Sequence, residues 1–376
     1  MATLIELYDS EPMKNIYAAD ALSPDRIIFL GGDEMVKGKR RLCRYFAGKA
    51  APKLHFEVCS IHDSRSCEEA LRRLIRSYPD ARIDLTGGTD EAVFAAGRLS
   101  AETDVPFIKS DIKKGVIRSV CNTAGLIAHG KTYSLDDRIR AAGAEIRGSG
   151  RYNLKDISKK IGSSSDVMWR IFLDYRAEWS RQVRYFQRVM GYDDNTFNVL
   201  KNTGDLVCNM GIMRRLKNDG ILAELQTNGN KIYFRFANPY VRKIITDVGV
   251  WLELFVYKAA LGSGVFSDTD ISVLIDWDGI DDDFNVINEI DVIAQKKEKT
   301  VFISCKSGPV SVEAVNEINV LKNRFGGEFS RAVIVTATPF SAENLCVYRR
   351  ALELGIIVAE LDDLKNDGLC EVFKNI

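Results

Sequence analysis

The sequence predicts an α/β protein of two or three domains, and three observations support this. Short apolar strands alternate with helical patterns through the first third of the chain. A charged helical stretch and a hairpin signal fill the middle, and apolar strands flanked by helices fill the last third. At 376 residues the chain exceeds the size at which single hydrophobic cores stop growing.

The composition is that of a globular protein with reduced thiols. Hydrophobic residues make up 46% and charged residues 28%, which excludes a disordered or fibrous chain. Lys and Arg number 52 and so do Asp and Glu, so a nucleic-acid partner would need a local basic patch. The eight cysteines form no CxxC pair, which argues against zinc. No run approaches the roughly 18 apolar residues of a membrane span, so a cytoplasmic location is expected.

Residues 1–150 are expected to form a doubly wound, mostly parallel sheet. Helical patterns, such as those at 33–50 and 66–79, separate the first five of six β-rich runs and imply right-handed crossovers. The runs are "TLIELY" (3–8), "RIIFL" (26–30), "LHFEV" (54–58), "RIDL" (82–85), "PFIKS" (106–110) and "GVIRSV" (115–120). Ligands of such sheets bind beyond the carboxyl ends of the strands.

The turn in "DLTGGTDEAVFAAG" (84–97) is the candidate binding site of this sheet. Gly87 and Gly88 let the backbone approach a ligand, Thr86 and Thr89 offer hydroxyls, and the next helix presents free N–H groups. The turn can therefore cradle a phosphate. It can equally be an ordinary strand-to-helix turn in which Thr89 caps the helix.

Residues 151–240 are expected to form a helical connector and a winged-helix-like module. The stretch 203–239 is interpreted as two helices and a hairpin, with Asn228-Gly229 as the two-residue turn. Basic side chains of the second helix can serve phosphates; they are Arg214, Arg215 and Lys217. Acidic residues offset them, so a dimerisation or spacer role remains open.

Residues 241–376 are expected to form strands flanked by helices. A helix at 240–264 carries Glu253 within an apolar stretch, where a carboxylate needs a partner or a metal. The further predicted elements are strands at 271–276, 284–295 and 300–306, a helix at 311–326 and a strand at 331–338.

Two charged residues occupy matching places on the second and third of these strands. Side chains alternate along a strand, so Glu289 shares a face with Asp291, and Ser304 shares a face with Lys306. If the two strands pair across their short turn, Asp291 and Lys306 converge at one edge. The pair can be a surface salt bridge or half of a metal-dependent nuclease site.

The motifs "NEID", ending at Asp291, and "SCK", ending at Lys306, follow the helix that carries Glu253. This arrangement resembles the CRISPR-associated branch of the PD-(D/E)xK restriction-endonuclease-like fold. The resemblance implies that Asp291, Glu253 and the carbonyl of Cys305 bind Mg²⁺ or Mn²⁺. It also implies that Lys306 is the catalytic lysine, which orients the attacking water.

Ser304 departs from the wider pattern, because many relatives carry Glu or Gln there. A hydroxyl is a poorer ligand than a carboxylate. Either Glu289 or Glu253 is therefore expected to compensate, or metal affinity is weak.

The "TGGT" turn, together with "YDSEPMKN" (8–15) after the first strand, resembles the CRISPR-associated Rossmann-fold (CARF) sensor domain. Members of that family bind cyclic oligoadenylates at a homodimer two-fold axis with these two loops. The ligand-binding residues that the resemblance implies are Asp9, Ser10, Asn15, Thr86, Gly87, Gly88 and Thr89. A lysine often follows the turn in relatives, whereas this chain has Asp90.

Together the resemblances cover nearly the whole chain and imply a single-chain ancillary nuclease of type III CRISPR systems. Its expected parts are a CARF domain (1–150), a connector with a winged-helix-like module (151–240) and a nuclease domain (241–376). The expected function is a homodimeric, metal-dependent nuclease that cyclic oligoadenylate, in particular cyclic tetra-adenylate, activates to cleave DNA, RNA or both. The alternative is a ligand-sensing, nucleic-acid-binding regulator whose nuclease site has lost activity, with Ser304 as the lesion.

Overall fold

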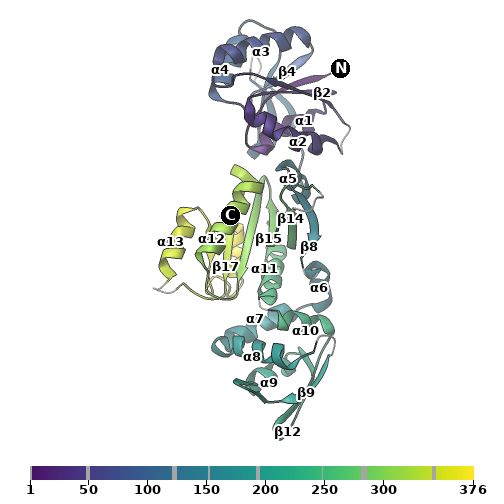
Figure 1. Cartoon of the computed structure of the whole chain (residues 1–376), viewed down its shortest axis with the longest axis vertical. Coiled ribbons are helices and arrows are strands. Elements are labelled where there is room, and N and C mark those ends of the chain that lie inside the picture. Colours follow the sequence, from purple (N-terminus) through teal and green to yellow (C-terminus); the bar gives the residue numbers. More distant parts are fainter. Residues whose placement is uncertain are drawn as a thin grey trace.

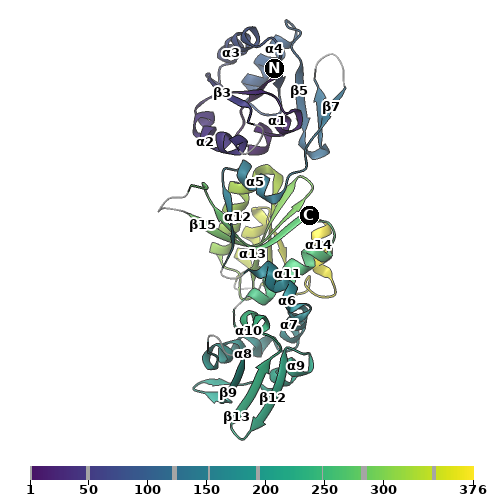
Figure 2. The same ribbon diagram turned by 90° about the vertical axis from the view of Figure 1, so that its right-hand side faces the viewer.

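The chain forms an elongated molecule of three bodies along one axis (Figures 1 and 2). The N-terminal domain (2–133) lies at one end and the middle module (153–247) at the other. The C-terminal domain (134–150 and 249–376) lies between them (Figure 1). The computed structural model describes residues 2–47, 51–120, 125–150, 153–191, 195–247, 249–280, 286–340 and 344–376.

The N-terminal domain is the predicted doubly wound sheet, in the order β3-β2-β1-β4-β5-β6-β7. Its first five strands pair in parallel, and β6 and β7 add antiparallel edges. The strands are β1 (Thr3–Leu7), β2 (Arg26–Gly31), β3 (Lys53–Val58), β4 (Ala81–Asp84), β5 (Phe107–Asp111), β6 (Val116–Ser119) and β7 (Leu126–His129). The helices are η1 (Pro12–Asn15), α1 (Tyr17–Leu22), α2 (Asp33–Ala47), α3 (Ser64–Ser77), α4 (Asp90–Ser100) and η2 (Ile112–Lys114).

Helices cover both faces of this sheet, which is why its central strands β1 and β2 are buried along almost their whole length. Helices α1 and α2 pack on one face, and α3 and α4 pack on the other. All five residues of β1 are buried. The last three residues of the helix predicted at 33–50 lie outside the described residues.

The middle module confirms the hairpin but not both predicted helices. Strands β12 (Leu222–Asn228) and β13 (Lys231–Phe236) form the hairpin, and β9 (Thr196–Leu200) pairs with β13. The prediction of a first helix within 203–239 is wrong. Strands β10 (Asn202–Thr203) and β11 (Leu206–Val207) form a ribbon there, since Gly204 adopts a φ of +64° that suits a turn. The helices are α6 (Leu154–Ile161), α7 (Ser164–Asp174), α8 (Arg176–Val189), α9 (Met210–Asn218) and α10 (Pro239–Thr246).

The C-terminal domain is a six-stranded sheet in the order β18-β17-β16-β15-β14-β8. Its strands are β8 (Glu145–Ser149), β14 (Asp268–Asp276), β15 (Ile287–Lys296), β16 (Lys299–Lys306), β17 (Ser330–Thr336) and β18 (Ile357–Ala359). Its helices are α5 (Leu135–Ala141), α11 (Val250–Gly262), α12 (Val312–Gly326), η3 (Gly327–Phe329), α13 (Leu345–Glu353) and α14 (Gly368–Lys374). Residues 284 and 285 of the strand predicted at 284–295 lie outside the described residues.

Strand β8 belongs to this sheet, although the expected domain boundary at residue 150 places it with the first domain. It pairs with β14 and so becomes the edge strand. Its sequence, "EIRGS", has the charged character of an edge strand, which carries little signal about its partner.

Two apolar layers hold the C-terminal sheet. One face packs on α11 and is continuous with the core of the middle module. The other face packs on α5 and α12. None of the described helices has the length and apolar character needed to span a membrane. The seven described cysteines are free thiols.

Candidate active site and ligand site

The C-terminal sheet forks between β15 and β16. Their antiparallel pairing reaches Val292 and Ile303 and ends there. Beyond that point β15 stays paired to β14 as far as Ile287, and β16 stays paired to β17 as far as Lys306. A cavity of about 190 Å³ opens at the fork.

The fork brings together the charged residues that strand alternation grouped in the sequence. The polar residues that line its cavity are Glu289, Asp291, Ser304, Lys306 and Glu317. Four of these five are expected site residues. Glu317 on α12 is an addition, and its only signal in the sequence is its place on the helix that follows the "SCK" motif.

Asp291 is held in one orientation by the neighbouring strand. Its Oδ2 accepts hydrogen bonds from the backbone N–H of Cys305 (2.6 Å) and from the hydroxyl of Ser304 (3.3 Å). The Nζ of Lys306 lies 4.0 Å from the same oxygen. Burial raises the pKa of Asp291, and Lys306 and the Cys305 N–H oppose that rise. All three contacts use Oδ2, so Oδ1 keeps its acceptor capacity.

Ser304 therefore acts on Asp291 in this structure. A hydroxyl at this position donates a hydrogen bond to the carboxylate, which a second carboxylate could not do when ionised. A carboxylate here would also add a like charge beside Asp291 and Glu289, which disfavours ionisation.

Glu253 lies on α11, which packs on the face of the sheet opposite α12. The charges of Asp291, Glu289 and Lys306 act on it there. Burial, followed by the negative charges of Asp291, Glu289 and Asp247, raises the pKa of Glu253 to about 8. Lys306 acts in the opposite direction. Acids from separate segments of the chain thus repel one another around the partly buried Glu253.

Glu289 is held by a strained residue of the neighbouring strand. Its Oε1 accepts a hydrogen bond from the hydroxyl of Ser272, a residue with φ of +54°. A Cβ on Gly150 would lie 2.5 Å from that hydroxyl, so a larger residue at position 150 would displace the Ser272–Glu289 contact. Non-glycine residues at positive φ are uncommon and cluster at functional sites.

The donor set at the fork fits a hard divalent cation. Within the described ranges, no three His, Cys, Asp or Glu side chains already surround a common point as a metal site. However, Mg²⁺ often binds through only one or two carboxylates and keeps several waters. Asp291 and Glu253 can supply such carboxylates. Burial and then the neighbouring negative charges raise the pKa of Glu253, and a cation would offset those charges.

In the N-terminal domain, the "TGGT" turn meets the first loop (residues 8–15), and the contact explains both glycines. A Cβ on Gly87 would lie 2.6 Å from the carbonyl oxygen of Leu7 and 2.8 Å from the Cβ of Asp9. A Cβ on Gly88, whose φ is +91°, would lie 2.7 Å from the Cβ of Leu7. The two segments expected to bind ligand therefore lie side by side.

The first loop is fixed from within by Asn15, which is fully buried. Its Oδ1 accepts from the N–H of Asp9 (2.8 Å), and its Nδ2 donates to the carbonyls of Asp9 (2.7 Å) and Glu11 (3.2 Å). Asn15 thus shapes the loop, whereas Ser10 is exposed at its surface.

The two threonines of the turn also hold its frame. The hydroxyl of Thr86 donates to Asp84 and accepts from the N–H of Ser110 (2.7 Å). The hydroxyl of Thr89 caps α4 and donates to the carbonyl of Ile61 (2.7 Å). The predicted N-cap is therefore formed. Both glycines pack against the end of β1 and the start of the first loop.

A basic cavity of about 600 Å³, missed by the sequence analysis, adjoins this turn. Its cationic residues are Lys14, Lys109, Lys113 and Arg118, and Thr86 also lines it. The signal was the run "KSDIKKGVIR" at the carboxyl end of the fifth strand. The lining also contains two acids, Asp111 and Glu328. The four cations outnumber them, so the cavity has a net positive charge.

This chain thus joins a doubly wound N-terminal domain with a basic cavity to a C-terminal domain with an acidic, lysine-bearing fork. Residues 240–374 match the family model of the Card1-like endonuclease domain. No curated protein matches the chain in a sequence comparison.

Solved structures share the fold of the whole chain. Protein VC1899 from Vibrio cholerae is 16% identical, with a TM-score of 0.73 over 99% of this chain and 98% of that one. Can2 from Sulfobacillus thermosulfidooxidans, solved in complex with cyclic tetra-adenylate, is also 16% identical, with a TM-score of 0.69 over 99% and 96%. The resemblance to CARF nucleases and the predicted fold class are confirmed.

Removing the charge of Glu253 should flatten the dependence of stability on pH. Its pKa of about 8 lies above the ordinary 4.5, so the folded protein keeps a proton that the unfolded chain releases between those values. The free energy of unfolding therefore falls as pH rises from about 5 to 8. With EDTA present, we expect the melting temperatures of both proteins to fall between pH 5 and 8. The fall for Glu253→Gln should be smaller than that for the wild type by on the order of a few °C.

The control for this measurement is Glu313→Gln, which changes an exposed carboxylate of α12. It should follow the wild-type curve. Equal slopes for wild type and Glu253→Gln would contradict the buried, mutually repelling carboxylates.

Proposed function

We propose that this protein is a metal-dependent nuclease that a cyclic oligoadenylate switches on in type III CRISPR defence. The observation that carries the proposal is the meeting of Asp291 and Lys306 at the fork of a domain that matches an endonuclease family, with Glu253 near enough for their charges to act on its pKa. Can2, which shares the fold, was solved with cyclic tetra-adenylate, so this ring is the first activator to test.

In the proposed reaction, Asp291, Glu253 and the carbonyl of Cys305 would hold Mg²⁺ or Mn²⁺. The bound ion supplies Lewis acidity and lowers the pKa of a coordinated water. Lys306, whose Nζ lies 4.0 Å from Asp291, would orient the attacking water and offset the charge that develops on the phosphate. The Cys305 N–H and Ser304 keep the Asp291 carboxylate in place, which limits the reorganisation needed during the reaction.

The first loop of the N-terminal domain contacts the C-terminal domain directly. The Oε2 of Glu11 accepts a hydrogen bond from the N–H of Glu328 (2.9 Å), and Lys14 pairs with the Glu328 carboxylate (2.9 Å). Phe329 packs into the core of the N-terminal domain. These contacts hold η3, which directly follows α12, and α12 lines the active-site cavity.

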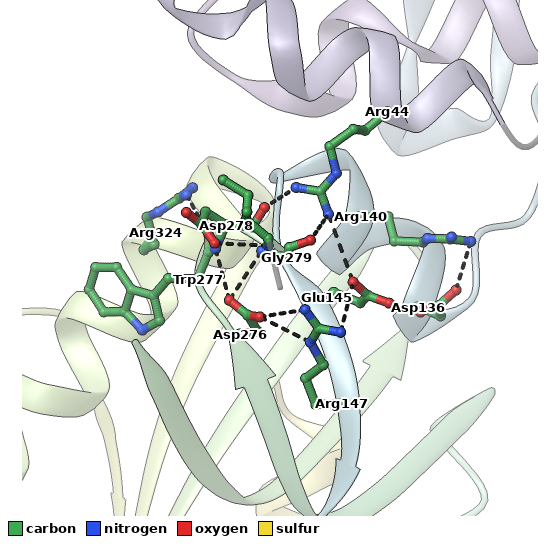
Figure 3. Close-up of polar contacts among 11 residues, drawn as sticks. Arg44, Asp136, Arg140, Glu145, Arg147, Asp276, Trp277, Asp278, Gly279 and Arg324 are labelled. Carbon is green, nitrogen blue, oxygen red and sulfur yellow. Dashed lines mark hydrogen bonds and ion pairs between the residues drawn. The ribbon is translucent and has the colours of Figure 1, made fainter. Parts of the chain in front are cut away.

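A second contact joins the two domains at the end of β14 (Figure 3). Arg44 on α2 donates to the carbonyls of Asp278 and Gly279 (2.9 Å to Gly279). From below, the fully buried Asp276 accepts from the N–H groups of the same turn and pairs with Arg147 (2.9 Å). Burial acts to raise the pKa of Asp276, but these hydrogen bonds lower it overall. The turn is thus held from both domains.

We infer that ligand binding acts through Lys14. Its ammonium is shared between Asp9 (3.4 Å) and Glu328 (2.9 Å) and lines the basic cavity. A ligand phosphate there competes with Glu328, which loosens the grip of the first loop on η3 and shifts the population of α12 positions. Two copies of the chain around one ring, as the CARF resemblance implies, would place both active sites under the same control.

The rival function is a regulator that binds ligand and nucleic acid without cutting. The observation that favours it is Ser304, which supplies a hydroxyl where many relatives have an acidic or amide ligand. The two functions separate when purified protein is incubated with plasmid, single-stranded DNA and RNA. Each mixture contains Mn²⁺, Mg²⁺ or EDTA, with or without cyclic tetra-adenylate. We expect cleavage only with metal and ring present, whereas binding without cleavage in every mixture would favour the regulator.

Lys306→Ala should lower the cleavage rate by about a hundredfold or more, because one positioned electrostatic group at a reacting centre contributes that much. Binding of cyclic tetra-adenylate, measured by calorimetry, should be unchanged. The matched control is Lys299→Ala at the other end of β16, where the lysine contacts the carbonyl of Ile376. Continued cutting by Lys306→Ala would show that the site lies elsewhere.

Glu328→Ala should make the enzyme more sensitive to its activator. The Lys14–Glu328 pair is partly exposed, so it contributes about 0.2–1 kcal/mol, which is about a 1.5- to 5-fold factor in affinity. We expect the concentration of cyclic tetra-adenylate for half-maximal cleavage to fall by this factor. Glu353→Ala, an exposed carboxylate of α13, is the control. A half-maximal concentration that stays equal or rises would argue against competition for Lys14.

A further inference from the structure

We propose that a cavity between α7, α8, α11 and the turn after Lys306 is a subsite for one unpaired nucleobase of the substrate strand. The inference rests on the proposed nuclease function and adds how the enzyme engages the strand next to the cut. The cavity has a volume of about 270 Å³. A single base is smaller than the drug-sized ligands that fill pockets of about 300 Å³ and more.

The cavity adjoins the active site through the residues that follow the catalytic lysine. Ser307 and Gly308, directly after Lys306, form part of its lining. The hydroxyl of Ser307 and the Oε1 of Glu253 lie 3.9 and 3.8 Å from the place that a Cβ on Gly249 would take. A strand whose phosphate lies beside Lys306 therefore has a neighbouring nucleotide next to this cavity.

Aromatic side chains give the cavity the surface that nucleobases prefer. Phe172, Trp179 and Trp251 line it. Base stacking on such rings tolerates any sequence, because every base has a π face. A base inside a duplex cannot reach such a cavity without leaving the stack, so the occupant belongs to a single-stranded or locally opened substrate.

Trp179 also carries a hydrogen-bond donor without a partner. The residue is 3% exposed, and its Nε1 forms no hydrogen bond with the residues that the structure describes. Buried donors are nearly always paired, so an orphan donor in a cavity lining calls for a ligand acceptor. Each base offers ring nitrogen or carbonyl acceptors on its edges, which can take this N–H.

The exposed face of α8 offers positive charge to the phosphate backbone of the substrate strand. Arg184 lines the cavity, is exposed, and forms no ion pair with any described residue. It is one of several exposed basic side chains on this helix, whose only acid is Glu178. The arginines are Arg176, Arg181, Arg184 and Arg188. Contacts of this kind position a strand without reading its sequence.

The test uses the full-length protein activated with cyclic tetra-adenylate in Mn²⁺, and 20-nucleotide single-stranded DNA. One oligonucleotide is intact. Each of the others carries one abasic nucleotide, at a different position in each strand. We expect abasic substitution at one position beside the cut to lower kcat/KM about tenfold, the loss that one stacked base predicts. Trp179→Phe keeps a ring but removes the N–H, so it should raise KM on intact DNA and weaken the abasic effect.

Trp169→Phe is the matched control. Trp169 stacks on Trp251 at 6.1 Å in the same aromatic cluster but lines a different cavity. Melting temperature and binding of cyclic tetra-adenylate verify that both variants fold. If Trp179→Phe does not fold, Arg184→Ala on the exposed face serves instead. It should raise KM and reduce the salt dependence of KM.

The outcomes separate the two proposals. If the wild type cuts neither the oligonucleotides nor the plasmid and RNA of the first assay, the nuclease function itself fails and the subsite fails with it. If it cuts plasmid or RNA but no oligonucleotide, the subsite alone is refuted. If it cuts but no abasic position matters, the subsite alone is refuted. The same conclusion follows if Trp179→Phe matches Trp169→Phe on every substrate.

Discussion

The hydrogen bond from the Cys305 N–H to Asp291, at 2.6 Å, is the contact on which the rest of the active site depends. It exists because β15 and β16 stop pairing at Val292 and Ile303, which frees a backbone donor of β16 for a side chain of β15. In a continuous ladder that N–H would serve the neighbouring strand. The fork also opens the cavity in which Glu289, Ser304 and Lys306 meet Asp291.

The position of this fork in the molecule explains how a distant ligand can affect it. The C-terminal domain, which contains the fork, lies between the N-terminal domain and the middle module (Figure 2). The first loop holds the end of α12 through Glu11 and Lys14. The middle module in turn packs its aromatic residues against α11, the helix that carries Glu253. Both neighbours therefore contact a helix that brings residues to the site.

Much of the site could be predicted from local sequence. Strand alternation and a short turn are enough to bring Asp291 and Lys306 together, and the glycines of "TGGT" mark a close approach of two loops. Ser304, the departure from the family pattern, could be interpreted only once its hydroxyl was placed against Asp291. The basic cavity and strand β8 were missed because both depend on contacts between segments far apart in the sequence. The ribbon at 202–207 was not predicted, because the positive φ of Gly204 forms a turn between two short strands where the sequence pattern indicated a helix.

Amide hydrogen exchange across the C-terminal domain, with and without cyclic tetra-adenylate, tests most directly whether the sensor controls the fork. Residues 304–329 contain the Cys305 amide, α12 and η3, so their protection reports both the Asp291 contact and the grip of the first loop. We expect ligand to change protection in this segment as well as around residues 8–15 and 86–89. A change confined to the N-terminal domain would contradict the coupling of the two sites.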